Sequence, residues 1–261
     1  MKVIILAGGM GTRLGEITEI LPKPMVLIGN QPILWHIMNI YSSYGFNEFI
    51  IALGYKSEVI KKYFIDYKFN NNDLNIDLNN GDITYLNNNY SKNWKVSLIF
   101  TGKESNTGGR LKRLKNLIGN NRFMFTYGDG LADIDINKLI KFHQENQKIA
   151  TVTAVRPNAR FGELLIENNF VNQFSEKPQT KDGWVNGGFF VCEPEVFKFI
   201  KDDRSSFERE SLEYLSKKNE LAAFKHEGFW QCMDTKRDRD YLIAQWENGK
   251  VEWARNWKID E

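Results

Sequence analysis

A glycine-rich segment directly after the first apolar run has the residue types needed to hold phosphate. Gly8, Gly9 and Gly11 follow Val3–Ala7 at once. The backbone can therefore turn sharply and bring its N–H groups close to an anion without interference from Cβ atoms. Thr12 and Arg13 then add a hydroxyl group and a planar guanidinium, both suited to phosphate oxygens. We interpret Gly8 to Arg13 as a phosphate-holding loop.

Two better-known phosphate motifs do not match this loop. Leu14 stands where the dinucleotide fingerprint requires its third glycine, and the Gly-Lys-Ser/Thr sequence of the other common phosphate loop is missing. An ordinary glycine-rich turn is the alternative. Lys23 favours the phosphate interpretation, because Pro22 and Pro24 restrict the backbone around it and so aim its ammonium group. Together with Arg13, Lys23 could neutralise a nucleoside triphosphate, although a solvated surface lysine is also possible.

Asp129 is a candidate ligand for a metal ion. It follows the apolar run Phe123–Tyr127 and lies between two glycines, which leaves its carboxylate exposed where a strand is expected to end. Mg²⁺ typically binds one or two carboxylates and takes its remaining ligands from phosphates and water. The protein would therefore need to supply only one more aspartate as a ligand of the metal ion. Asp133 and Asp135 are interpreted as turn residues.

The elements that must position these residues alternate between strand and helix. This alternation predicts a mostly parallel sheet with helices on both faces, in which ligands bind beyond the carboxyl ends of the strands. The expected strands are 3–7, 48–53, 96–100, 123–127 and 150–155, and the expected helices cover 33–41, 57–64 and 139–142. Gly45 is placed where the first of these helices should be capped.

The second half of the chain is less regular. Leu164–Ile166 and Phe170–Phe174, with a turn between them, resemble a hairpin. Residues 66–95 are rich in asparagine, which disfavours long regular elements, and are interpreted as an insertion between core elements. Because no Pro-rich or Gly/Ser-rich linker divides the chain, residues 1–261 are expected to form a single domain.

Composition limits the possible partners. The chain has 35 basic and 33 acidic residues, so its formal charge of +2 gives no reason to expect nucleic acid or an anionic membrane as a partner. No apolar stretch approaches the ~18 residues of a membrane span, and no signal peptide is apparent, so we expect a cytoplasmic protein without a membrane partner. Cys192 and Cys232, far apart, suggest neither a disulfide nor a zinc site.

Read as one unit, the loop and the proline-flanked lysine resemble the signature of the sugar-1-phosphate nucleotidyltransferases. Further segments of the same resemblance follow in the expected order and cover nearly the whole chain. The matching segments are Leu6-Ala-Gly-Gly-Met-Gly-Thr-Arg-Leu14, Leu21-Pro-Lys-Pro-Met25, Tyr127-Gly-Asp-Gly130, Phe174-Ser-Glu-Lys-Pro178, Asn186-Gly-Gly188 and Trp230-Gln-Cys-Met-Asp-Thr235. The resemblance implies a Rossmann-like, three-layer α/β fold with a mostly parallel sheet and a smaller β-rich acceptor-binding region at 156–235.

The family pattern assigns a role to each matching position. Arg13 and Lys23 are implied as catalytic residues, and Asp129 and Asp234 as ligands of Mg²⁺. The implied nucleotide-binding residues are Leu6, Ala7, Gly8, Gly9, Gly11, Thr12, Ser105, Thr107, Gly108, Gly109, Arg110 and Gly128. The implied acceptor-binding residues are Gly162, Glu176, Lys177, Asn186, Gly187 and Gly188. Two alternatives remain open: a solvated ion pair for Glu176 with Lys177, and a helix-surface position for Arg110.

Within the family, Thr107-Gly-Gly-Arg-Leu-Lys-Arg113 and Gly228-Phe-Trp-Gln231 look like the glucose-1-phosphate cytidylyltransferases. The implied partners are CTP and a sugar 1-phosphate, and the implied products are CDP-glucose and pyrophosphate. Another phosphorylated acceptor is the close alternative, and a non-catalytic nucleotide-binding protein is a weaker one. The resemblance also implies a homo-oligomer, since some family members assemble as hexamers. The three histidines and the C-terminal tryptophans are interpreted as structural.

Overall fold

A central sheet of seven strands forms the body of the molecule. The computed structural model describes residues 1–86, 92–157, 163–167, 170–175 and 183–257. Within these residues the strands of the sheet follow the order β14-β10-β13-β8-β1-β4-β7. Their bounds are β1 Val3–Ala7, β4 Glu48–Leu53, β7 Lys95–Phe100, β8 Phe123–Tyr127, β10 Ala150–Val155, β13 Val185–Cys192 and β14 Leu221–His226.

The sheet is mostly parallel, as predicted. β1 pairs in parallel with β4 and β8, β4 with β7, and β10 with β14, whereas β13 runs antiparallel to both β8 and β10. All five residues of β1 are buried. Such continuous apolar strands are expected where both faces of a sheet are covered, because neither side of the strand meets water.

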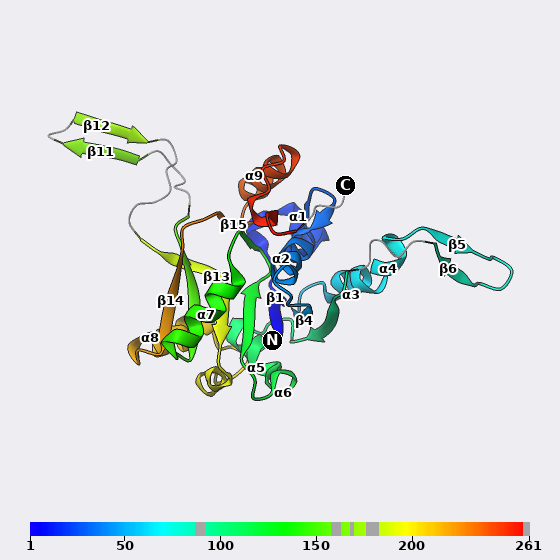
Figure 1. Ribbon diagram of the computed structural model, residues 1–261, viewed down its shortest axis with the longest axis horizontal. Coiled ribbons are helices and arrows are strands. Elements are labelled where there is room, and N and C mark those ends of the chain that lie inside the picture. The colour runs from blue at the N-terminus through cyan, green and yellow to red at the C-terminus, as the bar shows by residue number, and fades with distance from the viewer. Residues whose placement is uncertain (87–91, 158–162, 168–169, 176–182, 258–261) are drawn as a thin grey trace.

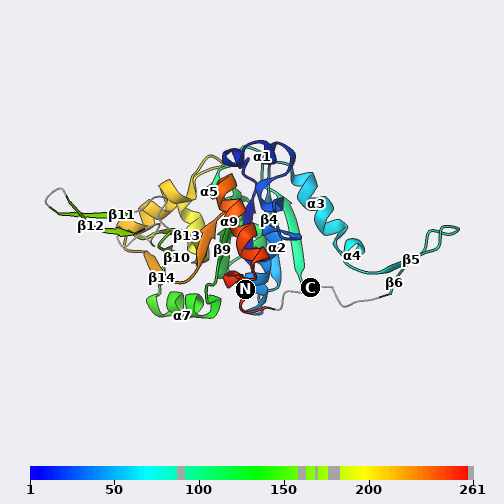
Figure 2. The same cartoon turned by 90° about the horizontal axis from the view of Figure 1, so that it is seen from above.

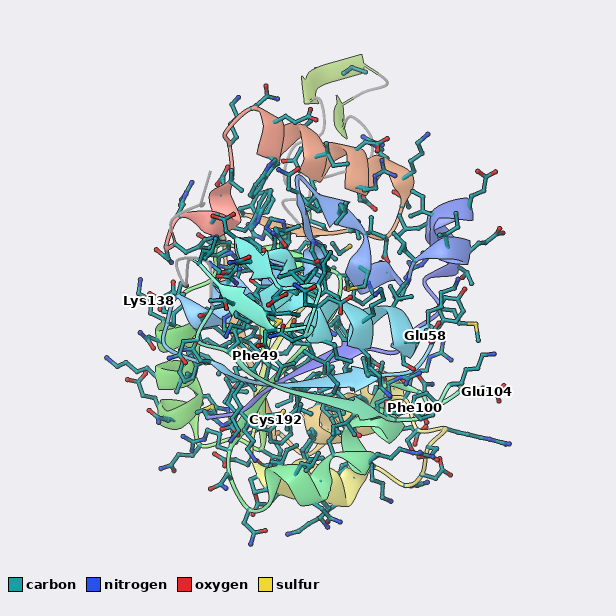
Figure 3. All side chains as sticks on the ribbon, turned by 90° about the vertical axis from the view of Figure 1, so that its right-hand side faces the viewer. Phe49, Glu58, Phe100, Glu104, Lys138 and Cys192 are labelled. Atoms are coloured by element: carbon teal, nitrogen blue, oxygen red, sulfur yellow. The ribbon has the colours of Figure 1, made fainter. Side chains whose placement is uncertain are left out.

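Helices cover both faces of the sheet, which confirms the three-layer architecture (Figure 2). On one face, the core receives side chains from α2 (Ile33–Ser42), α3 (Ser57–Ile65), α7 (Ile136–Asn146) and α9 (Lys236–Glu247), and from the short helix η5 (Glu252–Ala254). On the other face, it receives side chains from α5 (Thr107–Arg113), α6 (Lys115–Ile118), α8 (Glu213–Lys217), η3 (Pro194–Phe199) and η4 (Phe207–Leu212). Phe49 and Cys192 lie in the interior, while Glu58, Glu104 and Lys138 lie at the surface (Figure 3).

Helix α7 is longer than the predicted 139–142. Its start is fixed by Asp135, whose Oδ1 accepts a hydrogen bond from Lys138 N at 2.9 Å. This is a side-chain cap, which satisfies one of the free N–H groups of the first turn. The interpretation of Asp135 as a turn residue is therefore incomplete. Gly45, expected to cap α2, lies beyond the C-cap Ser43 and closes the following turn with φ 85°.

Two hairpins project from opposite sides of the body (Figure 1). β11 (Glu163–Glu167) pairs antiparallel with β12 (Phe170–Ser175), which confirms the predicted hairpin. In the asparagine-rich segment, α4 (Tyr67–Asn70) precedes a hairpin of β5 (Leu74–Ile76) and β6 (Ile83–Tyr85). These elements are short, and Lys95, at the end of the expected insertion, already belongs to β7 of the central sheet. β13 and β14, inside the expected acceptor-binding region, are also strands of that sheet.

Short elements at the carboxyl edge of the sheet carry the candidate site. They are η1 (Thr12–Leu14), α1 (Glu16–Ile20), η2 (Lys23–Met25), the hairpin of β2 (Leu27–Ile28) with β3 (Gln31–Pro32), and the antiparallel pair of β9 (Gly130–Ala132) with β15 (Trp230–Cys232). Among the described residues, no helix has both the length and the apolar character that a membrane span requires.

Candidate active site

The pairing of β9 with β15 brings two aspartates from distant parts of the chain together. Asp129 comes directly before β9 and Asp234 follows β15 after Met233, and Gly130 lies opposite Cys232 in the register. The ladder is extended by Met233 N, which donates to Asp129 O at 2.8 Å. The side chain of Met233 is fully buried and anchors this end of the ladder. The two carboxylates are thus held at one point by backbone pairing.

Lys23 lies between these carboxylates. Its Nζ donates to Asp129 Oδ2 at 2.6 Å and to Asp234 Oδ1 at 2.6 Å, and its side chain is 11% exposed. Pro24 and Met25, which follow it in η2, are buried and fix the backbone beneath it. The prediction that the flanking prolines aim this lysine agrees with its position, and the solvated-lysine alternative is wrong.

Arg13 completes a cluster of two cations and two anions. Its Nη1 lies 2.9 Å from Asp234 Oδ2, and its side chain is 70% exposed. Lys23 is therefore an interior partner of the carboxylates, whereas most of the Arg13 side chain faces solvent. An arginine in this position can reach an incoming anion and still touch the buried cluster.

The charges of the cluster stabilise one another. Burial opposes the charged form of Lys23, but Asp129 and Asp234 outweigh burial and raise the pKa of the ammonium group above its ordinary value. Burial likewise opposes the charged form of Asp234, but hydrogen bonding and attraction from Lys23, with a contribution from Arg13, lower the pKa of its carboxyl group. Lys23 and Asp234 therefore both carry their charges at neutral pH.

The two aspartates suit a divalent cation. Because Asp129 and Asp234 already approach one ammonium group to within 2.6 Å, their oxygens converge on a shared position. In the described part of the chain, no group of three or more acidic, histidine or cysteine side chains could hold a metal. Two carboxylates are what Mg²⁺ needs when phosphates and water supply its other ligands.

Asp238 fixes the position of Asp234. It was not predicted as a site residue. Its Oδ2 accepts from Asp234 N at 3.2 Å and from Thr235 N at 2.8 Å, and Asp238 N donates to Thr235 Oγ1 at 3.3 Å. This reciprocal capping box starts α9 directly after the aspartate. The Thr-Lys-Arg-Asp spacing at 235–238 is a visible signal for such a box. It would have identified Asp238 as a residue that positions Asp234.

The glycine loop follows β1 as predicted, and hydrogen bonds from two other segments hold its first residue in place. Gly8 O accepts from Tyr55 N at 3.1 Å and from Arg110 Nη2 at 2.9 Å. In the described structure, the N–H groups of Gly9, Met10 and Gly11 make no backbone–backbone hydrogen bond. They are therefore available to an anion, which is the property expected of a phosphate loop.

Arg110 is a buried cation that supports the glycine loop. Its side chain donates to the carbonyl oxygens of Leu53 at 3.2 Å, Gly102 at 2.7 Å and Lys103 at 3.3 Å, and to Thr101 Oγ1 at 3.0 Å, besides Gly8 O. The residue is 5% exposed, so the helix-surface alternative is wrong. Burial, with the nearby Arg113, lowers the pKa of the guanidinium. Arg110 ties together the loops after β1, β4 and β7.

Several predicted nucleotide-binding residues line one cavity of about 390 Å³ beside this loop. The glycine loop forms one wall, and the segment before α5 forms the other. The lining residues are Gly8, Gly9, Met10, Lys103, Glu104, Ser105, Asn106, Arg110 and Arg204. Arg204 was not predicted as a lining residue, because it is distant in sequence from the other lining residues. Gly108 and Gly109 are buried at the start of α5, and Gly109 N donates to Ser205 O at 3.3 Å.

The predicted acceptor residues of β13 lie next to Tyr127, at the end of β8. Asn186 Nδ2 donates to Tyr127 Oη at 3.2 Å, and Asn186 Oδ1 accepts from Gly188 N at 2.9 Å. Gly188 has φ 83°, and a Cβ atom there would lie 2.7 Å from the Tyr127 ring, so both conformation and space favour glycine. Gly187 O accepts from Trp230 Nε1 at 2.8 Å. Gly162, Glu176 and Lys177 lie outside the described residues.

The histidines and Asp133 lie away from the charged cluster. His36 and His143 are buried, His36 in the core beside Trp253 and His143 against Thr151 and Glu193. Asp133 pairs with His226 at 3.0 Å and with Arg255 at 3.3 Å, which is more than the turn role expected for it. The structural interpretation of the histidines agrees with these positions.

The charged cluster lies within a region that matches a known family of proteins. The model described as nucleotidyl transferase matches residues 2–246, which includes every element of the charged cluster. The chain belongs to the nucleotidyl transferase family. It is an enzyme of that family, and the resemblance inferred from the motifs is confirmed.

Individual members of the nucleotidyl transferase family are similar over their full length. The chain is 47% identical over 259 residues to glucose-1-phosphate cytidylyltransferase of Salmonella typhi, covering 99% of this chain and 100% of the relative. The same identity and coverage hold for glucose-1-phosphate cytidylyltransferase of Salmonella typhimurium. Among solved structures, HddC from Yersinia pseudotuberculosis matches with a TM-score of 0.68 and 25% identity, covering 94% of this chain and 99% of that one. These similarities confirm the fold class.

Proposed function

We propose that this enzyme converts CTP and α-D-glucose 1-phosphate to CDP-glucose and pyrophosphate. The observation that carries the proposal is the convergence of Lys23, Asp129 and Asp234 beside the glycine loop. This arrangement offers positive charge and metal-binding carboxylates where the phosphates of a nucleotide would lie. The nucleotide and the sugar come from the full-length similarity to the two Salmonella cytidylyltransferases.

The reaction requires no nucleophile from the protein. A phosphate oxygen of the sugar phosphate attacks the α-phosphorus of CTP, a new P–O bond forms there, and the bond to the β-phosphate oxygen breaks. The leaving group departs as pyrophosphate with the bonding electron pair. Catalysis of this kind depends on aligning two anions and stabilising charge at the reacting phosphorus. It is therefore a task for positioned cations.

Arg13 and Lys23 have the positions for that task. Arg13 is exposed and can bind phosphate oxygens, while Lys23 is buried between two carboxylates that keep it charged. Two unit charges ~4 Å apart interact by about 4 kcal/mol at an effective dielectric of 20, so two polyanions would repel strongly without such cations. The free N–H groups of the glycine loop add further donors.

We assign Mg²⁺ as the cofactor, with Asp129 and Asp234 as the side chains that would hold it. Such an ion, when bound, supplies positive charge to the triphosphate and to the departing pyrophosphate. The protein supplies the orientation of the two carboxylates: the β9–β15 ladder fixes Asp129, and the capping box of α9 fixes Asp234.

The cavity between the glycine loop and α5 is assigned to the cytidine. Its walls offer the hydroxyl of Ser105, the amide of Asn106 and the backbone near Lys103. Donors and acceptors of these kinds can read the edge of a pyrimidine. Asn186 is assigned to the sugar hydroxyls, because its side-chain amide donates one N–H group to Tyr127 Oη and keeps a second one.

Measurement of pyrophosphate release tests the proposal in two panels. In the first, glucose 1-phosphate is offered with CTP, UTP, dTTP or GTP, and we expect the highest kcat/KM with CTP. In the second, CTP is offered with a set of sugar 1-phosphates and other small phosphates. Turnover with another acceptor but not with glucose 1-phosphate would reject the sugar assignment, and a preference for another nucleotide would reject CTP.

A further inference from the structure

Glu208, at the start of η4, accepts hydrogen bonds from three hydroxyl groups, two of which belong to distant segments of the chain. Its Oε1 accepts from Tyr127 Oη at 2.6 Å, and its Oε2 accepts from Thr107 Oγ1 at 2.6 Å and from Ser206 Oγ at 2.8 Å. Among the ion pairs of the described residues, none involves this half-buried carboxylate. Hydroxyl groups therefore provide its observed stabilisation.

The directions of these hydrogen bonds are determined by the carboxylate. An ionised carboxylate can only accept, so the hydroxyl of Tyr127 uses its single hydrogen toward Glu208. The oxygen of Tyr127 is then left as an acceptor, and Asn186 Nδ2 donates to it at 3.2 Å. Because Asn186 Oδ1 accepts from Gly188 N, both ends of the amide are held in one orientation. Its second N–H group remains for a substrate.

A second branch leads from Glu208 to the nucleotide side. Thr107 Oγ1 donates to Glu208 and accepts from Phe207 N at 3.0 Å, so the first residue of α5 is fixed against η4. The same helix carries Arg110, whose guanidinium binds Gly8 O of the glycine loop. A shift of α5 would therefore be transmitted to the loop and to the cavity beside it.

We propose that Glu208 is a positioning residue that aligns the acceptor side and the nucleotide side of the active site. It acts through Tyr127 on Asn186 and through Thr107 on α5. This inference rests on the proposed function, because it takes Asn186 and α5 as the two substrate-binding sides. The π-helical geometry of η4 agrees with such a role, since this rare helix type occurs frequently at functional sites.

Four single variants separate the two branches. Tyr127→Phe removes the hydroxyl that holds Asn186, and we expect the KM for the sugar phosphate to rise about fivefold while the KM for CTP stays unchanged. Thr107→Val should raise the KM for CTP and leave the KM for the sugar phosphate unchanged, since it removes only the hydroxyl that fixes α5. Glu208→Gln should raise both KM values. Glu213→Gln, on the exposed surface of α8, is the matched control and should change neither.

A double variant tests whether Glu208 and Tyr127 act as one unit. In the variant with both Tyr127→Phe and Glu208→Gln, the KM for the sugar phosphate should equal that of the more affected single variant. Multiplied effects, or equal losses of kcat with unchanged KM values and a lower Tm, would overturn the positioning role. They would indicate that Glu208 only supports the fold.

Failure of this inference can be distinguished from failure of the proposed function. A wild-type enzyme that turns over CTP and glucose 1-phosphate, with variants that lack the KM split, overturns the inference alone. Wild-type protein that releases no pyrophosphate overturns the proposed function, and calorimetry with CTP then tests Glu208 directly. Weaker CTP binding by Thr107→Val and Glu208→Gln, with unchanged binding by Tyr127→Phe, supports the role. Equal binding by all variants contradicts it.

Discussion

Lys23 and Asp234 lie 211 positions apart in the chain, yet their side chains form a hydrogen bond of 2.6 Å in the interior of the candidate site. The lysine belongs to a segment near the first strand and the aspartate to the start of the last long helix. Six of the seven strands of the central sheet lie between them in the chain, so their contact depends on the folding of that sheet. Asp129 joins the pair from the centre of the chain at an equal distance.

Replacement of Lys23 by methionine should abolish most turnover. The variant keeps an unbranched side chain of nearly the same length but removes the charge between Asp129 and Asp234, leaving two carboxylates that repel each other. We expect kcat/KM to fall about 100-fold or more, a loss comparable to removal of one donor that stabilises transition-state charge. Pyrophosphate release measures the effect. Lys61→Met, on the exposed face of α3, is the control, and similar losses in both variants would contradict the assigned role.

Asp129→Ala should remove both activity and its dependence on Mg²⁺. The variant deletes one of the two carboxylates that would hold the ion, and Lys23 would retain Asp234 as its partner. The measurement is pyrophosphate release during a titration with MgCl₂. A variant that kept wild-type turnover and the same Mg²⁺ response would show that Asp129 is not a metal ligand.

Gly8→Ala and Gly9→Ala form a matched pair for the glycine loop. A Cβ atom at Gly8 would collide with the guanidinium of Arg110, whereas a Cβ atom at Gly9 would meet no atom within 4 Å. We expect Gly8→Ala to lower the free energy of unfolding by about 1–3 kcal/mol through this overpacking. Gly9→Ala should leave it nearly unchanged. Urea unfolding without nucleotide measures the difference, and equal stabilities would contradict the supporting role of Arg110.

Stability should fall as the pH drops from about 6.5 to about 4, because His36 is buried in its neutral form. Burial lowers the pKa of His36 from its ordinary value of 6.5 to about 4. Its Nε2 lies 2.9 Å from Ile28 O, and its Nδ1 lies 3.3 Å from Trp253 Nε1, which can only donate. Nδ1 is therefore the acceptor, and its protonation would break this contact.

The sign of the effect follows from proton binding. Between the two pKa values the unfolded chain binds a proton at His36 and the folded protein does not, so stability rises with pH in this range. The full difference corresponds to about 3 kcal/mol. Urea unfolding at pH 7, 6 and 5 should give a shallower pH dependence for His36→Gln than for the wild type. Equal slopes would show that His36 does not contribute.

Four strands of the central sheet were predictable because most of their residues are apolar. β1, β4, β8 and β10 match their expected bounds, since burial on both faces favours short runs of mostly apolar residues. β14 was not predicted, because its residues are only partly buried and its pattern is mixed. Such a strand can be identified only from its pairing with a neighbouring strand, here β10, and the sequence alone does not reveal this pairing.

The candidate site was predictable where short motifs carry it. Lys23, Asp129 and Asp234 were placed in one site by their motifs, although their mutual distances were not. The carboxylate of Glu208 was missed, because its partners Tyr127 and Thr107 lie 81 and 101 positions away. Arg110 was expected near the nucleotide, but not as a buried cation, since arginine is rarely buried so deeply. Long-range polar contacts leave little local signal.

The reversed direction of β13 gives the two halves of the site different origins in the chain. β1, β4 and β8 reach the carboxyl edge of the sheet at their last residues, whereas β13, running against them, reaches it at its first. The residues that we assign to the nucleotide thus follow strands, whereas Asn186, which we assign to the acceptor, lies at the beginning of one. The chain between β10 and β13, which includes the β11–β12 hairpin, contains none of the loops that follow β1, β4 and β8. We therefore expect that changes in the segment between β10 and β13 could alter the choice of acceptor without moving the loops that we assign to the triphosphate.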